Sequence, residues 1–140
     1  MRVLYPGGFD CFHHGHVNAL KAVKSLGYLM VGVNSDRLMK HYKRVPAQPE
    51  THRVKAVLRQ GIADEVFIWD GPEGQADQIL AHDPDVYVAG TDWLSKDLAK
   101  QLDIPHLAWF DQQRISLLYL RRTQGISTTQ IIKALDHGEG

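Results

Sequence analysis

The sequence predicts an α/β fold in which a parallel β-sheet carries helices on both faces. Two observations lead to this fold class. Strand-like and helix-like segments alternate, and the order strand then helix repeats four times along the chain. The segment Tyr28–Val33 is a continuous apolar run, which is typical of a strand covered on both sides. Such a sheet is Rossmann-like, and 140 residues suffice for one domain of this kind, which we expect to span residues 1–140.

The first strand and the first helix flank a glycine-rich turn. We expect a buried strand over Arg2–Tyr5 that stops at Pro6-Gly7-Gly8, where glycine lets the backbone turn sharply or approach a ligand. The helix that follows has apolar residues at every third position and ends near Gly27. These apolar residues are Val17, Leu20, Val23 and Leu26.

The middle of the chain continues the alternation. Asn34-Ser35-Asp36 offers caps for a short helical turn. Lys40–Pro49 is basic and contains two prolines, which indicates a loop. A second helix is expected from Glu50 to about Gln60. We expect its inner face to consist of Val54, Val57 and Leu58.

Two further strands and a helix complete the regular part of the chain. The pattern predicts a strand over Glu65–Trp69, a turn over Gly71–Gly74, a helix over Gln75–His82 and a strand over Asp85–Ala89. The last third is less regular, and Trp69 and Trp109 are expected to be packing residues. This last third contains candidate strands at His106–Trp109 and Leu117–Leu120 and a candidate helix from Thr128 to about Asp136.

Charge and cysteine content narrow the class of function. Sixteen basic and sixteen acidic residues cancel, so the net charge gives no reason to expect nucleic acid or an anionic membrane as a partner. The longest apolar run is too short to span a bilayer and no signal-peptide pattern is present, so we expect a cytoplasmic protein without a membrane partner. The single cysteine, Cys11, cannot form an internal disulfide, and we expect it to be a small buried side chain.

The loop after the first strand is the first place to look for chemistry. In an open parallel sheet, ligands bind at the carboxyl ends of the strands, here after Tyr5, Val33, Ala89 and Leu120. His13 and His16 follow the first of these ends and can share one face of the first helical turn. The N–H groups and dipole of a helix start favour an anion, and Gly15 leaves room for a ligand to approach the backbone.

Each imidazole can donate a hydrogen bond to a phosphate oxygen, as the stabilisation of a phosphoryl-transfer transition state requires. Two other interpretations stay open. The cluster could bind zinc, although its spacing matches no closed structural site and no cysteine pattern supports it. It could also be an incidental polar helix start.

Two motifs carry a resemblance to a known family. His13-His14-Gly15-His16 resembles the HxGH signature of the nucleotidyltransferase superfamily, and residues 7–16 resemble its longer form, G-x-F-D-x-x-H-x-G-H. Residues 122–129, Arg-Thr-Gln-Gly-Ile-Ser-Thr-Thr, resemble the RTxGISTT segment of the cytidylyltransferase branch. The motifs occur in the family's order and are separated by a matching alternation of strands and helices. The resemblance therefore implies the nucleotidyltransferase fold and a cytidylyltransferase activity.

The resemblance also implies site residues. Catalytic roles fall to His13, His16, Lys43 and Arg122. The nucleotide would contact Gly7, Gly8, Phe9, Asp10, Gly15 and His16 in the first loop, Gly90, Asp92 and Trp93 after the fourth strand, and Arg122, Thr123, Gly125, Ile126, Ser127 and Thr128 in the second motif. Lys43, with Lys40 and Arg53 as further candidates, would contact the substrate phosphate. Asp10 would help to place Mg²⁺.

Structural roles remain open at several of these positions. Ser127, with Gln130 three residues later, has the pattern of a helix cap, and a cap and a phosphate contact are compatible. Trp93 fits plain core packing equally well. Lys40 and Lys43 also fit a solvated basic loop.

The implied reaction transfers CMP from CTP to a phosphorylated alcohol, with glycerol 3-phosphate as the best match, and the resemblance implies a homodimer. The alternatives are an adenylyltransferase acting on a sugar phosphate or FMN, and a catalytically silent nucleotide-binding module. Three departures from the family pattern bear on the substrate: Thr91 replaces a second acidic residue, Gly61 replaces an arginine, and the residues around Asp103–Gln112 are extra.

Overall fold

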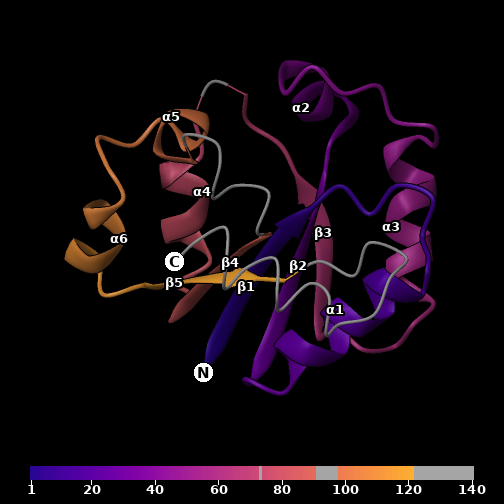
Figure 1. Ribbon diagram of the computed structural model, residues 1–140, viewed down its shortest axis with the longest axis horizontal. Coiled ribbons are helices and arrows are strands. Elements are labelled where there is room, and N and C mark those ends of the chain that lie inside the picture. The colour runs from indigo at the N-terminus through magenta and orange to yellow at the C-terminus, as the bar shows by residue number, and fades with distance from the viewer. Residues whose placement is uncertain (73, 91–97, 122–140) are drawn as a thin grey trace.

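One parallel sheet organises the computed structural model, which describes residues 1–72, 74–90 and 98–121 (Figure 1). Its strand order is β3-β2-β1-β4-β5, and every recorded pair of neighbours is parallel. The chain moves outward from β1 to β3 and then returns to place β4 on the other side of β1. This order confirms the predicted Rossmann-like sheet. The strands are β1 (Arg2–Gly7), β2 (Tyr28–Asn34), β3 (Glu65–Trp69), β4 (Val86–Gly90) and β5 (Ser116–Leu120).

Side chains that alternate along the strands build two separate cores, one on each face of the sheet. Val3 of β1 belongs to the core with α1 (His14–Lys24) and α3 (Glu50–Leu58). The next residue, Leu4, belongs to the core on the opposite face. That second core also contains residues of α2 (Asp36–His41), α4 (Ala76–Ala81), α5 (Leu98–Leu102) and α6 (Ala108–Gln112). Period-two burial with helices on both faces is the arrangement that the sequence predicted.

The central strands part at their carboxyl ends. β1 pairs with β2 along its whole length, from Arg2 to Gly7, but its recorded register with β4 covers only Val3 and Leu4. β1 therefore runs two residues beyond its predicted end. Pro6 is tolerated inside it because its missing N–H falls where β4 no longer pairs with β1. The separation of β1 from β4 leaves space at the carboxyl edge of the sheet.

The predicted strand over His106–Trp109 is wrong, because this segment leads into helix α6. The amide N–H groups of Trp109 and Phe110 donate to the carbonyls of His106 and Leu107, at 3.0 and 3.1 Å. Both aromatic side chains are buried in the same core, which two neighbouring residues of a strand could not achieve. A short apolar run does not distinguish the two structures.

Other boundaries and burial predictions also need correction. Lys40 lies in the last turn of α2 rather than in the loop. Leu58, expected on the inner face of α3, is 56% exposed, and Leu26, just beyond α1, is also exposed. Cys11, expected to be buried, is exposed. The strands at β3 and β4, the helix at α4 and the strand at β5 lie where the sequence placed them, within one residue at each end.

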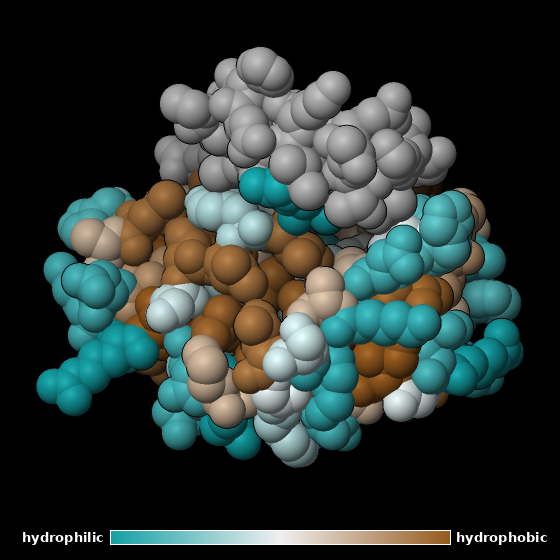
Figure 2. Space-filling model, turned by 60° about the horizontal axis from the view of Figure 1, so that its bottom comes forward, coloured by the Kyte–Doolittle hydropathy of each residue, from teal (hydrophilic) through white to brown (hydrophobic). Residues whose placement is uncertain are grey.

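The surface differs between the two sides of the molecule. In Figure 2 apolar side chains form their most continuous patch on the side where β5 and α6 lie in Figure 1. Leu107, just before α6, and Leu118 of β5 are among the exposed large hydrophobic residues.

No helix within the described ranges has both the length and the apolar character needed to cross a membrane.

Candidate active site

A cavity of about 210 Å³ opens where β1 and β4 separate. Its walls include the end of β1 and the loop that follows, Asn34 at the end of β2, and the segment from Tyr87 to Gly90 of β4. Three of the four strand ends that the sequence singled out therefore surround one space. The fourth, after β5, leads at residue 122 out of the described part of the chain.

The first helical turn of α1 holds the two motif histidines in a reciprocal arrangement. His13 is the N-cap, and its Nδ1 accepts a hydrogen bond of 3.0 Å from the amide of Gly15. The Nδ1 of His16 accepts a bond of 3.1 Å from the amide of His13. The two rings lie with centroids 4.1 Å apart, and both side chains line the cavity. The pair thus forms a capping box with imidazoles in the places of the usual serine and glutamate.

This arrangement fixes the hydrogen-bonding role of both rings. A backbone amide can only donate, so each Nδ1 must be an acceptor without a proton. In a neutral ring the proton then sits on Nε2, and both His13 and His16 present Nε2 as a donor. Two donors at a helix N-terminus suit a phosphate group.

Aromatic packing orients the His16 ring. Phe12 stacks on it at 5.0 Å, and Phe9 packs at 5.7 Å from another side. Phe9 is buried and has a φ of +53°, a left-handed backbone that a non-glycine residue rarely adopts. The loop is therefore held in a strained conformation that places Phe9 beneath the histidine.

Asp10 anchors this loop to the basic loop that precedes α3. Its two carboxylate oxygens accept hydrogen bonds from the amides of Ala47, at 2.7 Å, and Gln48, at 3.0 Å. Asp10 also lines the cavity, and it is the only carboxylate among the described lining residues. Each of its oxygens keeps a second lone pair, so the anchoring role does not prevent contact with a cation.

Arg53 has a different role from the phosphate contact that the resemblance suggested. Its side chain is fully buried, with Nε donating to the carbonyl of Gln48 and Nη1 donating to the carbonyls of Gly8 and Asn34. Nη2 donates to the carboxylate of Asp36 at 2.7 Å. Four protein acceptors enclose the guanidinium, so Arg53 holds the loops around the cavity and does not face a substrate phosphate.

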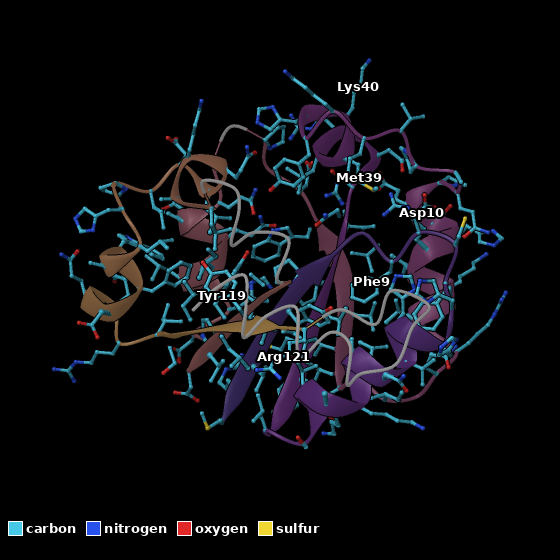
Figure 3. The ribbon with its side chains drawn as sticks, in the orientation of Figure 1. Phe9, Asp10, Met39, Lys40, Tyr119 and Arg121 are labelled. Carbon is cyan, nitrogen blue, oxygen red and sulfur yellow. The ribbon has the colours of Figure 1, made fainter. Side chains whose placement is uncertain are left out.

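The basic residues after β2 do not all reach the cavity. Lys40 is exposed and points away from the body of the molecule, whereas the preceding residue of α2, Met39, is buried and lines the cavity (Figure 3). Lys43 is exposed and is not among the lining residues. The next residue, Arg44, does line the cavity. Of the three basic residues Lys40, Lys43 and Arg44, only Arg44 lines the cavity that the two histidines also line.

A second wall of the cavity was not predicted from the sequence. Trp69, expected only to pack, donates from its indole Nε1 to Oε1 of Gln75 at 2.7 Å. The Nε2 of Gln75 donates to the hydroxyl of Tyr42 at 2.6 Å. These three residues and Tyr87 line the cavity. Trp69 and Tyr87 belong to the core on one face of the sheet, whereas Phe9, which packs against His16, belongs to the core on the other face. Gly32 permits this arrangement, because a Cβ there would lie 2.9 Å from the Cβ of Trp69.

The remaining predicted site residues divide into two groups. Gly7, Gly8 and Gly90 line the cavity, while Gly15 is buried within α1 and its amide is used by His13. The rest lie outside the described residues: Asp92, Trp93, Arg122, Thr123, Gly125, Ile126, Ser127 and Thr128. Within the described ranges, no three His, Cys, Asp or Glu side chains are grouped so that they could hold a metal ion.

A family model described as cytidylyltransferase-like matches residues 4–134, nearly the whole chain. The chain belongs to the cytidylyltransferase-like family. It is therefore a nucleotidyltransferase, and the resemblance noted in its two motifs is confirmed.

Individual relatives agree with this assignment. The chain is 34% identical over 134 residues to a glycerol-3-phosphate cytidylyltransferase of Bacillus spizizenii, covering 94% of this chain and 95% of the relative. It is 31% identical to an ethanolamine-phosphate cytidylyltransferase of Dictyostelium discoideum, covering 96% of this chain and 38% of that protein. Among solved structures, a lipopolysaccharide core biosynthesis protein of Thermoplasma volcanium has the same fold, with a TM-score of 0.67 and 25% identity over 88% of this chain and 96% of that one.

Proposed function

We propose that the protein transfers CMP from CTP to glycerol 3-phosphate. A phosphate oxygen of glycerol 3-phosphate attacks the α-phosphorus of CTP, and the bond from that phosphorus to the oxygen bridging to the β-phosphate breaks. CDP-glycerol and pyrophosphate leave, and no covalent enzyme intermediate forms. The observation that carries this proposal is the similarity to glycerol-3-phosphate cytidylyltransferases. The alignment with the Bacillus spizizenii relative covers 94% of this chain.

The geometry around the histidines supports this chemistry. His13 and His16 present Nε2–H donors beside the start of α1, where positive dipole charge favours the negative charge that builds on the phosphate oxygens. Arg44 lines the same cavity and can neutralise part of that charge. Catalysis then consists of holding two phosphate groups in line and stabilising the transition state.

The other predicted contacts complete the proposal. Arg122 would clamp the triphosphate, and Ser127 and Thr128 would bind it, as the resemblance implies. Lys43 lies one residue from Arg44 and would add positive charge if its side chain turned toward bound substrate. Asp10 would contribute a protein carboxylate to Mg²⁺, since Mg²⁺ is commonly held by one or two carboxylates together with substrate phosphates. The cation would supply charge neutralisation for the leaving pyrophosphate.

We also propose that the protein forms a homodimer and acts in the cytoplasm, where CTP is available. The family resemblance supports the dimer, and the apolar surface beside β5 in Figure 2 offers an area that a second copy could cover. Light scattering coupled to size-exclusion chromatography would test the dimer directly. A single species with the mass of one 15.8 kDa chain would contradict it.

Pyrophosphate release tests the reaction. The purified protein with Mg²⁺ would be assayed with CTP, ATP, UTP and GTP, each against glycerol 3-phosphate, phosphoethanolamine, phosphocholine, a sugar phosphate and FMN. We expect release only with CTP, and fastest with glycerol 3-phosphate. Activity with ATP alone would identify the adenylyltransferase alternative. Binding of CTP without release of pyrophosphate with any acceptor would identify a silent nucleotide-binding module.

A further inference from the structure

We propose that the hydroxyl of Tyr87 recognises a hydroxyl group on the alcohol part of the acceptor, and that this wall of the cavity selects a phosphorylated polyol that is uncharged apart from its phosphate. The inference rests on the proposed function and specifies the acceptor half of the site. Tyr87 would then be a specificity-determining residue in the cavity that the two histidines also line.

The first argument is the unusual state of this hydroxyl. Tyr87 is the second residue of β4, is only 4% exposed and lines the cavity. Among the described residues its hydroxyl makes no hydrogen bond. Every side-chain polar atom that is fully enclosed in this part of the chain does have a hydrogen-bond partner, so the Tyr87 oxygen is not fully enclosed. The Tyr87 oxygen must therefore reach open space, and the cavity is the space that Tyr87 lines. Buried hydroxyls are normally paired, so one aimed into a cavity indicates a ligand partner.

The second argument is the protonation state of the group. Burial holds the pKa of Tyr87 far above its usual range, and the neighbouring Tyr42 and Tyr119 raise it further. The group therefore remains a neutral phenol that can both donate and accept a hydrogen bond. A hydroxyl on the substrate has the same two capacities and is its natural partner.

Gln75 supplies a second, pre-oriented polar group on this wall. The indole N–H of Trp69 can only donate, so it fixes Oε1 of Gln75 on its own side and directs Nε2 toward Tyr42. Nε2 carries two N–H groups, and the bond to Tyr42 uses one of them. The Gln75 side chain is 1% exposed and lines the cavity, so the amide is held rigidly beside the space that Tyr87 faces.

The rest of this wall argues against a charged alcohol. Met39, Leu98 and Leu102 contribute apolar surface, and the polar groups are neutral hydroxyl, amide and indole groups. Asp10 is the only carboxylate among the described lining residues, and it lies in the loop after β1, where it anchors the loop that precedes α3. Among the described residues of this wall, an ammonium group on the acceptor would find no carboxylate to balance its charge.

Helix α6 sets the position of the Tyr87 ring. Phe110 of α6 packs against that ring with centroids 5.1 Å apart, and Trp109 packs against Phe110 at 5.2 Å. Both belong to the segment that is extra relative to short cytidylyltransferases. This segment therefore affects the site indirectly, because Phe110 packs against Tyr87, the residue that we assign to acceptor recognition.

The test combines one atom removed from the protein with one atom removed from the substrate. Tyr87→Phe keeps the ring and deletes only the hydroxyl. Wild type and variant would be assayed with CTP and four acceptors: glycerol 3-phosphate, its two monodeoxy analogues 2-hydroxypropyl and 3-hydroxypropyl phosphate, and propyl phosphate. When a site binds a substrate hydroxyl through a hydrogen bond, removing one partner of that bond lowers kcat/KM by roughly ten- to a hundredfold.

We expect Tyr87→Phe to lower kcat/KM about ten- to a hundredfold for glycerol 3-phosphate and for one monodeoxy analogue. We expect a change below about twofold for the analogue lacking the recognised hydroxyl and for propyl phosphate, with the KM for CTP unchanged. The matched control is Tyr119→Phe, which deletes a neighbouring hydroxyl on β5 that does not line the cavity (Figure 3). We expect this control to match wild type with every acceptor.

Three results would overturn the assignment of Tyr87. An equal loss with all four acceptors would show a structural role, a higher KM for CTP would show that Tyr87 contacts the nucleotide, and unchanged kinetics would show no role. Phosphoethanolamine or phosphocholine used better than glycerol 3-phosphate would overturn the uncharged acceptor. If none of the acceptors supports pyrophosphate release by the wild-type protein, the proposed function itself fails, and the assignment of Tyr87 fails with it.

Discussion

The guanidinium of Arg53 donates a hydrogen bond of 2.8 Å to the carbonyl oxygen of Gly8, in the loop that leads to the two motif histidines. The same side chain binds the carbonyls of Asn34 and Gln48, so one buried cation connects three segments at the edge of the cavity. Asp10 makes a second link between two of these segments. The relative positions of the histidines and the basic loop therefore depend on a residue that does not itself face the cavity.

Replacing Arg53 should destabilise the fold. In Arg53→Lys the single ammonium cannot reproduce the planar set of donors, and we expect the free energy of unfolding to fall by about 2–4 kcal/mol. Urea denaturation measures this change. Arg59→Lys, an exposed substitution just beyond α3, is the matched control and should change stability by less than about 0.5 kcal/mol. If Arg53→Lys is as stable as wild type but binds phosphate substrates weakly, then Arg53 contacts substrate after all.

Removing the Nε2 donor of His16 should slow turnover strongly and leave the start of α1 folded. In His16→Asn the amide oxygen can replace Nδ1 as the acceptor for the His13 amide, but nothing replaces Nε2. We expect kcat to fall by about 10²–10³ and stability to change by less than about 0.5 kcal/mol. His14→Asn, an exposed neighbour outside the cavity lining, should retain wild-type kcat. Wild-type turnover in folded His16→Asn would rule out the proposed role.

The two neighbouring cations of the basic loop should differ in their contribution. Because Arg44 lines the cavity and Lys43 does not, Arg44→Met should raise the KM for a phosphate substrate by about tenfold or more, and by more than Lys43→Met does. Steady-state kinetics with CTP and with the acceptor varied in turn would measure both. The reverse order would show that substrate binding brings Lys43 into the site, as the resemblance suggested.

Asp70 should make stability depend on acidic pH. Its carboxylate accepts hydrogen bonds from Arg37 and Ser35, which lower its pKa to about 2. The bound carboxylate stabilises the fold above the unfolded-state pKa of about 3.9, and this contribution is lost as the pH falls toward 2. Because Asp70 is partly exposed, we expect Asp70→Asn to cost less than about 1 kcal/mol at pH 7.

The difference between Asp70→Asn and wild type should shrink as urea titrations are repeated from about pH 4 down to pH 2. Asp83→Asn is the control, because Asp83 is exposed and its left-handed φ of +48° suits asparagine as well. It should change stability by less than about 0.5 kcal/mol at pH 7. A difference for Asp70→Asn that stays constant down to pH 2 would contradict the assignment.

The parts of the fold that were predictable are those whose sequence pattern has one physical interpretation. The apolar run identified β2 because Leu29–Val33 is buried on both faces of the sheet, and only its first residue, Tyr28, is exposed. Ser35 caps α2 because its side chain accepts a hydrogen bond from the amide of Leu38. The prediction of a strand over His106–Trp109 failed because four residues of mixed apolar character fit a helix as well as a strand. Only contacts between distant parts of the chain decide between them.

The candidate site shows the same limit. The motif located His13 and His16, but the exchange of hydrogen bonds between them was missed, because histidine is not among the residues that usually cap a helix. Arg53 was interpreted as a candidate contact for the substrate phosphate, because the resemblance implied that role. Its partners are mostly backbone carbonyls from three other segments, and no local pattern reveals them.

The partial pairing between β1 and β4 has a mechanical consequence. Beyond Tyr87 the recorded ladder holds β4 to the sheet through β5 alone, which pairs with it from Val86 to Gly90. β5 therefore holds in place the part of β4 that forms one wall of the cavity. The segment that the resemblance assigns to the nucleotide begins just after β5 ends. A substitution that loosened β5 would be felt at both substrates at once, although β5 lies at the edge of the sheet.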